Sequence, residues 1–536
     1  MTSLQKQIVF DEPNKPQKND IFYWTKKDIN ISSHILDKFA KDNDFVLDPF
    51  MGSGSNLYGS VLSKNSIKFI GAEINEMPFK NLLTNISLNR DKLVSLKEKI
   101  KIFEEKYKYL YTYSIAGIKG EVILQKAYVN IINSKIYPKE FFVLIKNSNH
   151  NLKISKDENS QYFDEFSKIY AQKNYKQIEL SKLENYNLIE NSRIAINKDL
   201  RISDLFSPVN YSILINFKNF CKNNNELKFL LSQVLQLCKF TDKKSQSQFI
   251  FWFPKKYAVD RNIIQTLKKK LLSIEKKVFS HEASLDNLIC SKFDELETTK
   301  KSLFLINKPF QSVNNKEIPD QSIDLVFTDP PYFDQIPFSE YLEIWKFFLN
   351  YKNNLSKEVV QSNRKEKSMN RDKYLNNLYL VFKNVSKKLK EKKYALIYFK
   401  DTNFVNLQDF IFTLSKCNLY FKDIIHVPRN IKTYKQNNSS ESTLTGESIF
   451  IFQKLVSQKY LFSIDINQEN NENYVNNFIE SYLVKNDRPS LSQILDDGLL
   501  KVLIKKDALK KIKNINQLKK IIKKKFFIDK NNHISK

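Results

Sequence analysis

A carboxylate, two prolines and a tyrosine directly follow an apolar stretch in the second half of the chain. Residues 323–328 are typical of a buried strand, and Asp329-Pro330-Pro331-Tyr332 comes next. Because two prolines cannot continue a strand ladder, this tetrapeptide is predicted to leave the sheet as a stiff loop at the strand's carboxyl end. Open α/β sheets bind ligands at that edge, so a carboxylate, fixed carbonyls and an aromatic ring would face a ligand there. The alternative is an ordinary proline turn with a tyrosine in the core.

A second segment collects glycine in a chain that otherwise avoids it. Only 8 glycines occur, about 1.5% of the chain against a usual level of about 7%, and four of them lie within twenty residues. The stretch 44–75 predicts a strand (45–47), a glycine turn, a helix (56–63) and a second strand (68–74) that carries Glu73 near its end. Such a unit is typical of a nucleoside-cofactor site, because glycine admits the ligand, the helix N-terminus offers N–H groups and the acid can bind ribose. The alternative for the glycines is chance clustering or helix packing.

Together these segments resemble the S-adenosylmethionine-dependent amino-methyltransferases of DNA, which methylate an exocyclic base amine. VLDPFMGSGS (46–55) and FIGAEIN (69–75) look like their cofactor motifs, and TDPPYF (328–333) looks like their catalytic motif. The upstream segment FYWTKKDINISSHIL (22–36) is similar to the part that closes over the methionine end of the cofactor. The segments that look like late strands of the same sheet are KYALIYFK (393–400) and ESIFIFQK (447–454).

The resemblance implies a role for each matched residue. The residues implied to bind the cofactor are Asp48, Phe50, Gly52, Gly54, Glu73, Tyr23 and Thr25. The residues implied to be catalytic are Asp329, Pro330, Pro331 and Tyr332. Asp329 and the Pro330 carbonyl would accept hydrogen bonds from the target amine, and Tyr332 would stack on a flipped-out base with help from Phe333. Glu73 would hold the ribose.

The chemistry of amine methylation agrees with these roles. A base amine is a poor nucleophile because its lone pair is delocalised into the ring, and two acceptors on its N–H groups would favour the geometry needed for attack. Most of the rate should come from aligning the amine with the methyl group, and the acceptors would stabilise the developing positive charge. Because the amine is inaccessible in a duplex, the base must swing out, and one stacked aromatic ring offsets about 1–3 kcal/mol of that cost.

The sequence also departs from the family pattern. Many members have an acidic residue before the catalytic strand that contacts the cofactor's adenine, but here the stretch LINKPFQSV (305–313) has none, so that contact is unassigned. The usual threonine is replaced by Ser55. About 275 residues separate the glycine turn from the Asp-Pro-Pro-Tyr segment, which matches the subgroup with its recognition region inserted between the two motifs. An aspartate in the first position is more typical of adenine methylation, and a serine of cytosine methylation.

Composition narrows the class of partner. With 87 Lys and Arg against 59 Asp and Glu, the 536-residue chain carries a net charge of +28, which points to a polyanionic partner such as nucleic acid. A biased Lys-, Asn- and Ile-rich composition is the alternative. The four cysteines form no CxxC pair, so a disulfide framework and a zinc ribbon are not expected, nor is a metal site. The polar N-terminus and the lack of an apolar run of about 18 residues predict a cytoplasmic protein of the prokaryotic type.

The fold class predicted is α/β, a Rossmann-like methyltransferase sheet with a large inserted recognition region and a basic C-terminal extension. The predicted units are 1–90 with the cofactor motif, 91–300 as the inserted region, 301–455 with the catalytic motif, and 456–536 as the extension. Within the insertion, 91–111 predicts a long exposed helix, and 244–279 predicts an aromatic strand, a basic loop and a basic helix. The residues predicted to contact DNA there are Trp252, Phe253, Lys255, Lys256 and Arg261, with a solvated helix face beside a core aromatic strand as the alternative. The predicted tail helix carries a lysine-rich face, which would either grip phosphate or be merely solvated.

We expect adenine-N6 methylation of DNA, with S-adenosylmethionine as cofactor and a cognate restriction endonuclease as a further partner. Three alternatives remain open. The first is the same chemistry on the N4 amine of cytosine. The second is methylation of RNA, which the lack of a recognisable RNA-binding module disfavours. The third is a non-catalytic nucleic-acid-binding protein with a relic fold, which the intact Asp-Pro-Pro-Tyr segment and Glu73 disfavour.

Overall fold

The structure is a computed structural model. It describes residues 23–24, 26–146, 148–176, 184–243, 250–278, 285–298, 302–334, 336–352, 354, 356–365, 368–427, 447–455, 471–529 and 532–535. Within these residues, no helix has both the length and the apolar character needed to cross a membrane.

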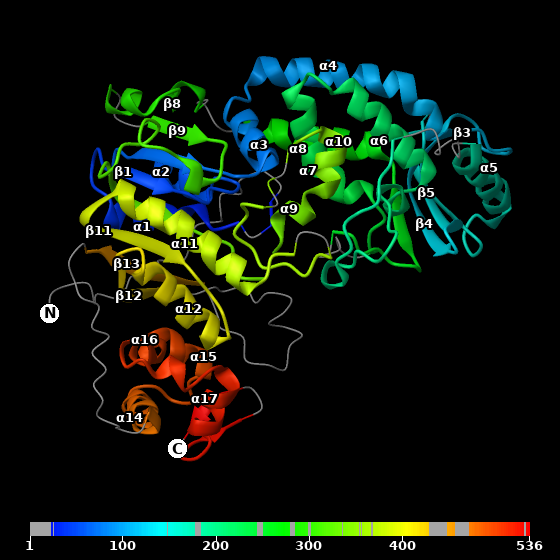
Figure 1. Cartoon of the computed structure of the whole chain (residues 1–536). Coiled ribbons are helices and arrows are strands. Elements are labelled where there is room, and N and C mark those ends of the chain that lie inside the picture. The colour runs from blue at the N-terminus through cyan, green and yellow to red at the C-terminus, as the bar shows by residue number, and fades with distance from the viewer. Residues whose placement is uncertain are drawn as a thin grey trace.

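An eight-stranded sheet forms the centre of the part of the molecule that carries both motifs (Figure 1). Its strands, in spatial order, are β12 (Leu419–Val427), β13 (Glu447–Lys454), β11 (Leu389–Tyr398), β10 (Ile323–Thr328), β1 (Phe45–Asp48), β2 (Lys68–Ala72), β9 (Ser302–Ile306) and β8 (Ile289–Cys290). All neighbouring pairs from β11 to β8 run parallel, whereas β13 runs antiparallel to both of its neighbours. This arrangement confirms the predicted Rossmann-like sheet.

Both faces of this sheet are covered, as a parallel sheet requires. Alternate residues of each strand point to opposite faces, so Val46 belongs to one hydrophobic cluster and Leu47 to the other. On the face of Val46, the helices α1 (Ile29–Phe39), α2 (Ser55–Leu62) and α3 (Glu76–Ile86) bury residues in its cluster, which extends into the rest of the molecule. On the face of Leu47, α11 (Arg371–Lys388) and α12 (Phe404–Ser415) do the same, and that cluster continues into the C-terminal helices.

The insertion between β2 and β8 builds a second sheet with helices packed against it. Its strands are β3 (Thr112–Tyr113), β4 (Val122–Ile132), β5 (Lys135–Ile145), β6 (His150–Ser155) and β7 (Ala258–Arg261). Its helices are α4 (Arg90–Tyr107), α5 (Phe163–Lys176), α6 (Pro208–Phe220), α7 (Asn225–Cys238) and α8 (Ile263–Val278). Two short helices that follow the catalytic motif, α9 (Phe338–Tyr341) and α10 (Glu343–Leu349), connect the two parts, and α10 contacts both α6 and α7.

Two local predictions for the insertion need correction. Ile250 and Phe251 are buried but lie in a turn, and the strand begins only at β7, beyond the basic loop. The predicted aromatic strand was therefore wrong over residues 250–253, while 244–249 lie outside the described residues. Helix α4 is not exposed all round, because Leu93, Ile100 and two further apolar residues form a buried face. The basic helix is confirmed as α8.

The C-terminal extension packs against the main sheet domain through α12. It contains α14 (Asn471–Leu483), α15 (Leu491–Ile494), α16 (Leu500–Lys505), α17 (Ile515–Ile522) and the short pair β14 (Phe527–Ile528) and β15 (Ile534–Ser535). The predicted amphipathic tail helix is α17, with Ile515, Leu518 and Ile522 buried. The Phe404 amide at the start of α12 donates to the Lys513 carbonyl, so the extension is tied to the sheet domain by backbone as well as by packing.

The pairing of β1 with β10 joins the two motif-bearing segments, which are far apart in the sequence. Val46 pairs with Leu325 and Leu47 with Val326, so both strands end at the same edge of the sheet. Beyond the last pair, the Thr328 hydroxyl donates to Asp48 Oδ1 over 2.6 Å, and both residues are buried. Asn56 at the start of α2 donates to the other oxygen of Asp48 at 2.9 Å. The carboxylate thus holds the glycine turn and the catalytic strand in a fixed relation.

We predict that Thr328→Val lowers the free energy of unfolding by about 1–3 kcal/mol, because it leaves a buried carboxylate oxygen with one donor fewer. Urea unfolding followed by tryptophan fluorescence measures this. The matched control is Thr112→Val, which removes a hydroxyl that donates to the Lys108 carbonyl at an exposed position. Equal losses in the two variants would contradict the role given to the Asp48–Thr328 bond.

Candidate functional site

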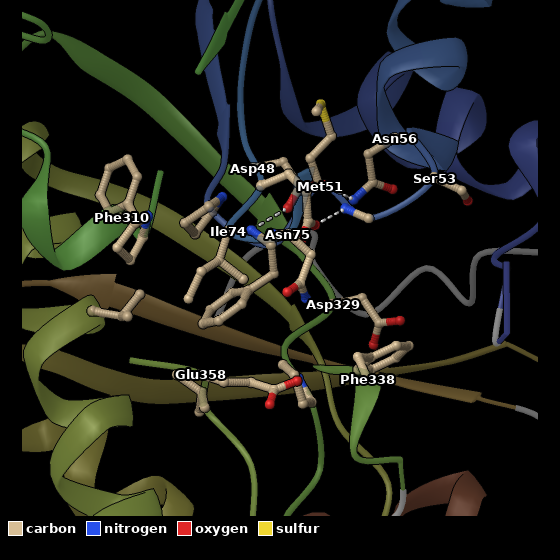
Figure 2. Close-up of a pocket in the computed structure, with 18 of the residues that line it drawn as sticks. Asp48, Met51, Ser53, Asn56, Ile74, Asn75, Phe310, Asp329, Phe338 and Glu358 are labelled. Carbon is tan, nitrogen blue, oxygen red and sulfur yellow. Dashed lines mark hydrogen bonds between the residues drawn. The ribbon is translucent and has the colours of Figure 1, made fainter. Parts of the chain in front are cut away.

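A cleft opens at the carboxyl edge of the sheet, where the ends of β1, β2, β9 and β10 converge. The space within it, counted together with its open mouth, is about 830 Å³. Residues from both motifs line it, among them Gly52, Glu73 and Asp329. Figure 2 shows Phe310 at one end of the lining residues and Asp329 with Phe338 at the other, with Asp48, Ile74 and Asn75 between them. Two segments separated by the whole insertion therefore share one cavity.

The glycine turn brings backbone, not side chains, to the wall of the cleft. Gly52 has a φ of +54°, and a Cβ there would lie 3.1 Å from the ring of Tyr23. The Gly52 amide donates to Glu73 Oε2 at 2.9 Å, and the Asn75 amide donates to Glu73 Oε1 at 2.8 Å. These bonds fix the Glu73 carboxylate in the wall of the cleft, where each oxygen keeps a further lone pair for a ligand.

Buried carboxyl groups dominate the electrostatics of the cleft. Burial raises the pKa of Asp48, of Glu73 and of Glu358 to about 7 in each case. Glu358 Oε1 accepts from the Ser339 amide at 2.8 Å, while Oε2 is buried without a hydrogen-bond partner among the described residues. A cleft lined by four carboxyls, the fourth being Asp329, suits a ligand that carries positive charge and donates hydrogen bonds.

The catalytic motif leaves β10 as predicted and presents its carboxylate to the same cleft. Asp329 and Pro331 line it. The Tyr332 hydroxyl donates to Asp329 Oδ1, and the Tyr332 ring lies 5.2 Å from that of Phe399. Burial raises the pKa of Asp329, and the neighbouring Lys27 ammonium opposes that rise. Pro330 and Tyr332 do not line the cleft, so Asp329 is the residue of the motif that offers it a carboxylate able to accept hydrogen bonds from an amine.

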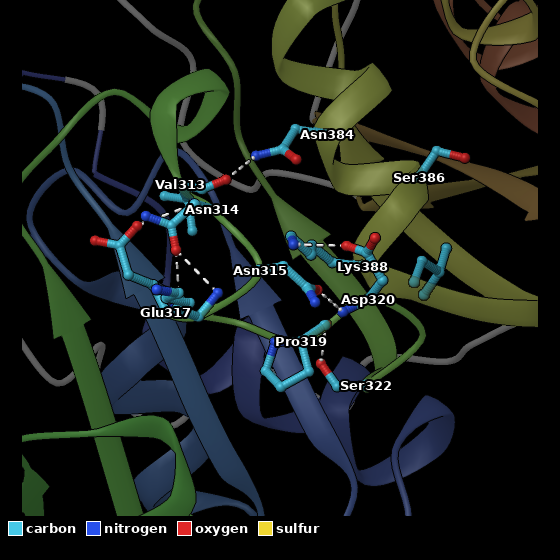
Figure 3. Close-up of polar contacts among 12 residues, drawn as sticks. Val313, Asn314, Asn315, Glu317, Pro319, Asp320, Ser322, Asn384, Ser386 and Lys388 are labelled. Atoms are coloured by element: carbon cyan, nitrogen blue, oxygen red, sulfur yellow. Dashed lines mark hydrogen bonds and ion pairs between the residues drawn. The ribbon is translucent and has the colours of Figure 1, made fainter.

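The opposite end of the cleft is formed by part of the stretch 305–313, in which no contact to the cofactor's adenine could be assigned from the sequence. Pro309, Phe310 and Gln311 follow β9 and line the cleft together with Ile74. Asn384 of α11 donates to the carbonyls of Phe310 and Val313, each at 2.8 Å. Figure 3 shows the bond from Asn384 to Val313, together with the ion pair between Lys388 and Asp320 further along the same loop, whose atoms lie 2.6 Å apart. The loop that carries Phe310 is therefore held against α11.

Several lining residues were not found by sequence reasoning. Six lining residues were not named individually as site residues, although the first three lie in segments matched to the family: Lys27, Ile74, Asn75, Phe310, Phe338 and Glu358. Ile74 and Asn75 directly follow Glu73, so their place after a strand end was a usable signal. Nothing in the local sequence around Glu358 marks it, because its place depends on the path of the chain after α10.

The structure also corrects some predicted site residues. Gly54 begins α2 with a φ of +82° and faces Leu82, and it does not line the cleft. Phe333 is 1% exposed and packs on Tyr374, so the prediction that it contacts the base was wrong. One guanidinium nitrogen of Arg261 donates to Thr241 and to the Leu237 carbonyl, which holds the side chain within the insertion, and its predicted DNA contact stays a prediction.

The remaining predicted residues fall into three groups. Tyr23, Asp48 and Phe50 line the cleft, and the Tyr23 ring stacks on Phe338 with centroids 5.2 Å apart. Thr25 lies outside the described residues. Lys255 and Lys256 are exposed on the loop before β7, in the insertion and away from the cleft.

Comparison with known proteins agrees with the geometry of the cleft. The family model described as DNA methylase, of the N6/N4 type, matches residues 5–85 and 323–533, which together exceed half of the chain. The chain belongs to this family. The match includes every residue of both motifs and excludes most of the insertion, as expected for a methylase with its recognition region between the two. No curated protein matches the chain significantly.

Solved structures with partial similarity include several methyltransferases. One is a candidate DNA modification methylase from Thermus thermophilus, with 16% identity, a TM-score of 0.16, and coverage of 30% of this chain and 57% of that one. Another is an S-adenosylmethionine-dependent methyltransferase from Methanosarcina mazei, with 10% identity, a TM-score of 0.18, and coverage of 35% and 79%. A third is a candidate class I methyltransferase from Listeria monocytogenes, with 12% identity, a TM-score of 0.19, and coverage of 47% and 88%. The chain thus spans just over half the length of the first of these proteins.

The cleft fits the cofactor of this family, S-adenosylmethionine. Two buried polar atoms on its lining residues, Ser55 Oγ and Glu358 Oε2, have no hydrogen-bond partner within the described chain. The carboxyl groups match a ligand that carries a sulfonium and an ammonium group. A Cβ added at Gly52 would press on the ring of Tyr23, which also lines the cleft, so a side chain at this position would alter the wall of the cleft.

We predict that Gly52→Ala weakens binding of S-adenosylmethionine at least tenfold, because the added methyl group intrudes at the wall of the cleft. Isothermal titration calorimetry measures this. The matched control is Gly117→Ala, since Gly117 also has a positive φ (+83°) and its Cβ would lie 3.2 Å from a tyrosine ring, that of Tyr162, in the insertion. Both variants should lose about 1–2 kcal/mol of stability from the strained backbone. Equal cofactor binding by the two would contradict the assigned site.

Proposed function

We propose that this methylase transfers a methyl group from S-adenosylmethionine to the N6 amine of adenine in DNA, after the base has swung out of the duplex. The observation that carries the proposal is that Gly52 and Asp329 line one cleft. S-adenosylmethionine supplies a methyl group activated by a positively charged sulfur. The Asp-Pro-Pro-Tyr form of the catalytic motif favours adenine over cytosine.

The residues of the catalytic motif would bind and orient the amine. Asp329 and the Pro330 carbonyl accept its two N–H groups, which localises the lone pair on nitrogen and stabilises the positive charge that develops there. Asp329, or water beside it, then takes the proton that the nitrogen releases. Tyr332 would stack on the base, with Phe399 behind it, and offset about 1–3 kcal/mol of the unstacking cost.

The cofactor's orientation follows from the two ends of the cleft. The end with Asp329 must receive the reactive methyl group, so the adenine moiety would lie at the other end, between Ile74 and Phe310. Gln311 Nε2 donates to the Lys357 carbonyl at 3.0 Å, which leaves its Oε1 as an acceptor for the adenine amino group. An amide would thus serve where relatives use an acid. Glu73, between the two ends, would accept from the ribose hydroxyls.

We predict that Asp329→Ala abolishes methyl transfer while S-adenosylmethionine still binds within a few-fold of the wild-type affinity. Transfer of labelled methyl groups to DNA and calorimetric titration measure the two properties. The matched control is Asp334→Ala, since Asp334 is a half-exposed carboxylate a few residues downstream that pairs with Arg193. An Asp329→Ala enzyme with full activity would remove the mechanism.

Two features of the proposed substrate can be tested directly: which base is methylated, and whether the nucleic acid is DNA or RNA. Mass spectrometry of nucleosides from methylated DNA should give N6-methyladenine, and N4-methylcytosine would establish the rival base. Labelled-methyl transfer to tRNA should be absent. We further propose a cognate restriction endonuclease as partner, in which case methylated DNA should resist cleavage by that enzyme.

The insertion would supply DNA contacts through the loop before β7. Trp252 and Tyr257 are 42% and 50% exposed there, next to the exposed Lys255 and Lys256. The Lys255 carbonyl accepts from the Ile131 amide at 2.8 Å, so this loop is fixed beside the tip of the β4–β5 hairpin. Two exposed lysines flanked by exposed aromatic rings suit a partner with phosphates and bases.

We predict that the double substitution Lys255→Ala, Lys256→Ala weakens DNA binding. The salt dependence of DNA binding should also become weaker, with the magnitude of the slope of log K against log salt smaller by up to about 2. The control pair, Lys101→Ala with Lys106→Ala on α4, removes the same charge from the top of the molecule as drawn in Figure 1. Fluorescence anisotropy over a salt series measures both. Identical slopes for the two double variants would contradict the proposed contact.

A further inference from the structure

A buried lysine connects the catalytic carboxylate to the start of β13. Lys27 Nζ lies 3.3 Å from Asp329 Oδ2 and 3.4 Å from Glu447 Oε2. The Lys27 side chain is only 10% exposed, and those of Asp329 and Glu447 are 21% and 13% exposed. The ammonium group also lies over the rings of Tyr398, at 4.7 Å, and Tyr332, at 5.7 Å. Three segments remote in sequence therefore meet at one charge cluster.

Within this cluster, both oxygens of the Asp329 carboxylate, which the target amine must reach, already have partners. Asp329 Oδ2 pairs with Lys27, and Oδ1 accepts from the Tyr332 hydroxyl. We infer that Lys27 is a positioning residue, which keeps Asp329 ionised and aimed at the cleft and moves onto Glu447 when the base amine takes its place. This inference rests on the proposed function.

Electrostatics explain why such a residue is needed. Burial raises the pKa of Asp329, and the nearby Glu447 carboxyl acts in the same direction. Only the ionised carboxylate can accept hydrogen bonds with both oxygens, so a protonated Asp329 would bind the amine poorly. Lys27 supplies the cation that opposes the rise. The other titratable groups that face Asp329 are Tyr23, Asp48, Tyr332 and Tyr398.

Glu447 gives the lysine a second partner at nearly the same distance. If Asp329 were its sole partner, an arriving amine would leave a buried ammonium unpaired, which is costly. With Glu447 on β13, Lys27 can keep one ion pair while it releases Asp329. Lys27 can thus keep Asp329 ionised before the substrate binds and release it when the amine arrives.

The test is the pH dependence of kcat/KM for DNA in Lys27→Met. Removal of the positive charge should raise the pKa of Asp329, so the acid limb of the profile should move upward by about 1–2 pH units. At pH values below the wild-type limb, kcat/KM of Lys27→Met should be tenfold to a hundredfold lower than that of the wild type. At pH values above the variant's own limb, it should recover. Lys27→Arg should keep the wild-type limb. Glu447→Gln, which removes a neighbouring negative charge, should move the limb downward.

Other outcomes would overturn the inference. A loss in Lys27→Met that is equal at all pH values would indicate a purely structural role. A tenfold weaker affinity for S-adenosylmethionine with an unmoved limb would show that Lys27, which also lines the cleft, binds the cofactor instead. Lys357→Met is the control, since Lys357 lines the same cleft but bonds to Ser312 and should leave the limb in place. If the wild-type protein methylated no DNA, the proposed function would fail before this question arose.

Discussion

The parallel pairing of β1 with β10 is the constraint on which the rest of the site depends. It places Asp48 and Thr328 at the same edge of the sheet, where one buried carboxylate joins the glycine turn, the start of α2 and the catalytic strand. The whole insertion lies between these strands in the sequence, yet their ends are fixed to within a hydrogen bond. Because the cleft forms where the strands end, its shape is determined by strand order and not by the loops alone.

The cleft is rich in acidic side chains although the chain as a whole is strongly basic. The chain carries a net charge of +28, but its cleft is lined by four carboxyls with two lysines. A polyanionic partner is attracted by the surface as a whole, while the cavity favours a cationic ligand. The two demands of DNA methylation, a negatively charged substrate and a positively charged methyl donor, are thus met in different places.

Much of the fold and the centre of the site could be predicted from the sequence. The strands at 45–47, 68–74 and 323–328 were recognisable because each is an apolar run followed by glycine, proline or acidic residues, which are typical of the loop after a strand. Glu73 and Asp329 follow such strands, so their meeting at one edge follows from a parallel sheet. Phe310 could not be assigned, because its place depends on the anchoring of its loop to α11 and not on a local motif.

Other features depend on the tertiary arrangement and leave no local mark. Lys27, Asp329 and Glu447 come from three distant segments, and no spacing rule brings them together. Phe333 was misread because aromatic residues beside a catalytic loop serve the core and the ligand equally well in sequence, and here Tyr374 and Arg371 enclose it. The aromatic run before β7 was misread because burial of Ile250 and Phe251 does not require a strand.

The most direct test of the shared cleft is a crystal structure of the protein with S-adenosylhomocysteine, the product form of the cofactor. The structure predicts the ligand's sulfur between the Gly52 turn and Asp329, its ribose on Glu73 and its adenine beside Phe310. A ligand bound elsewhere, or one whose sulfur lies away from Asp329, would contradict the claim that the two motifs form one catalytic site.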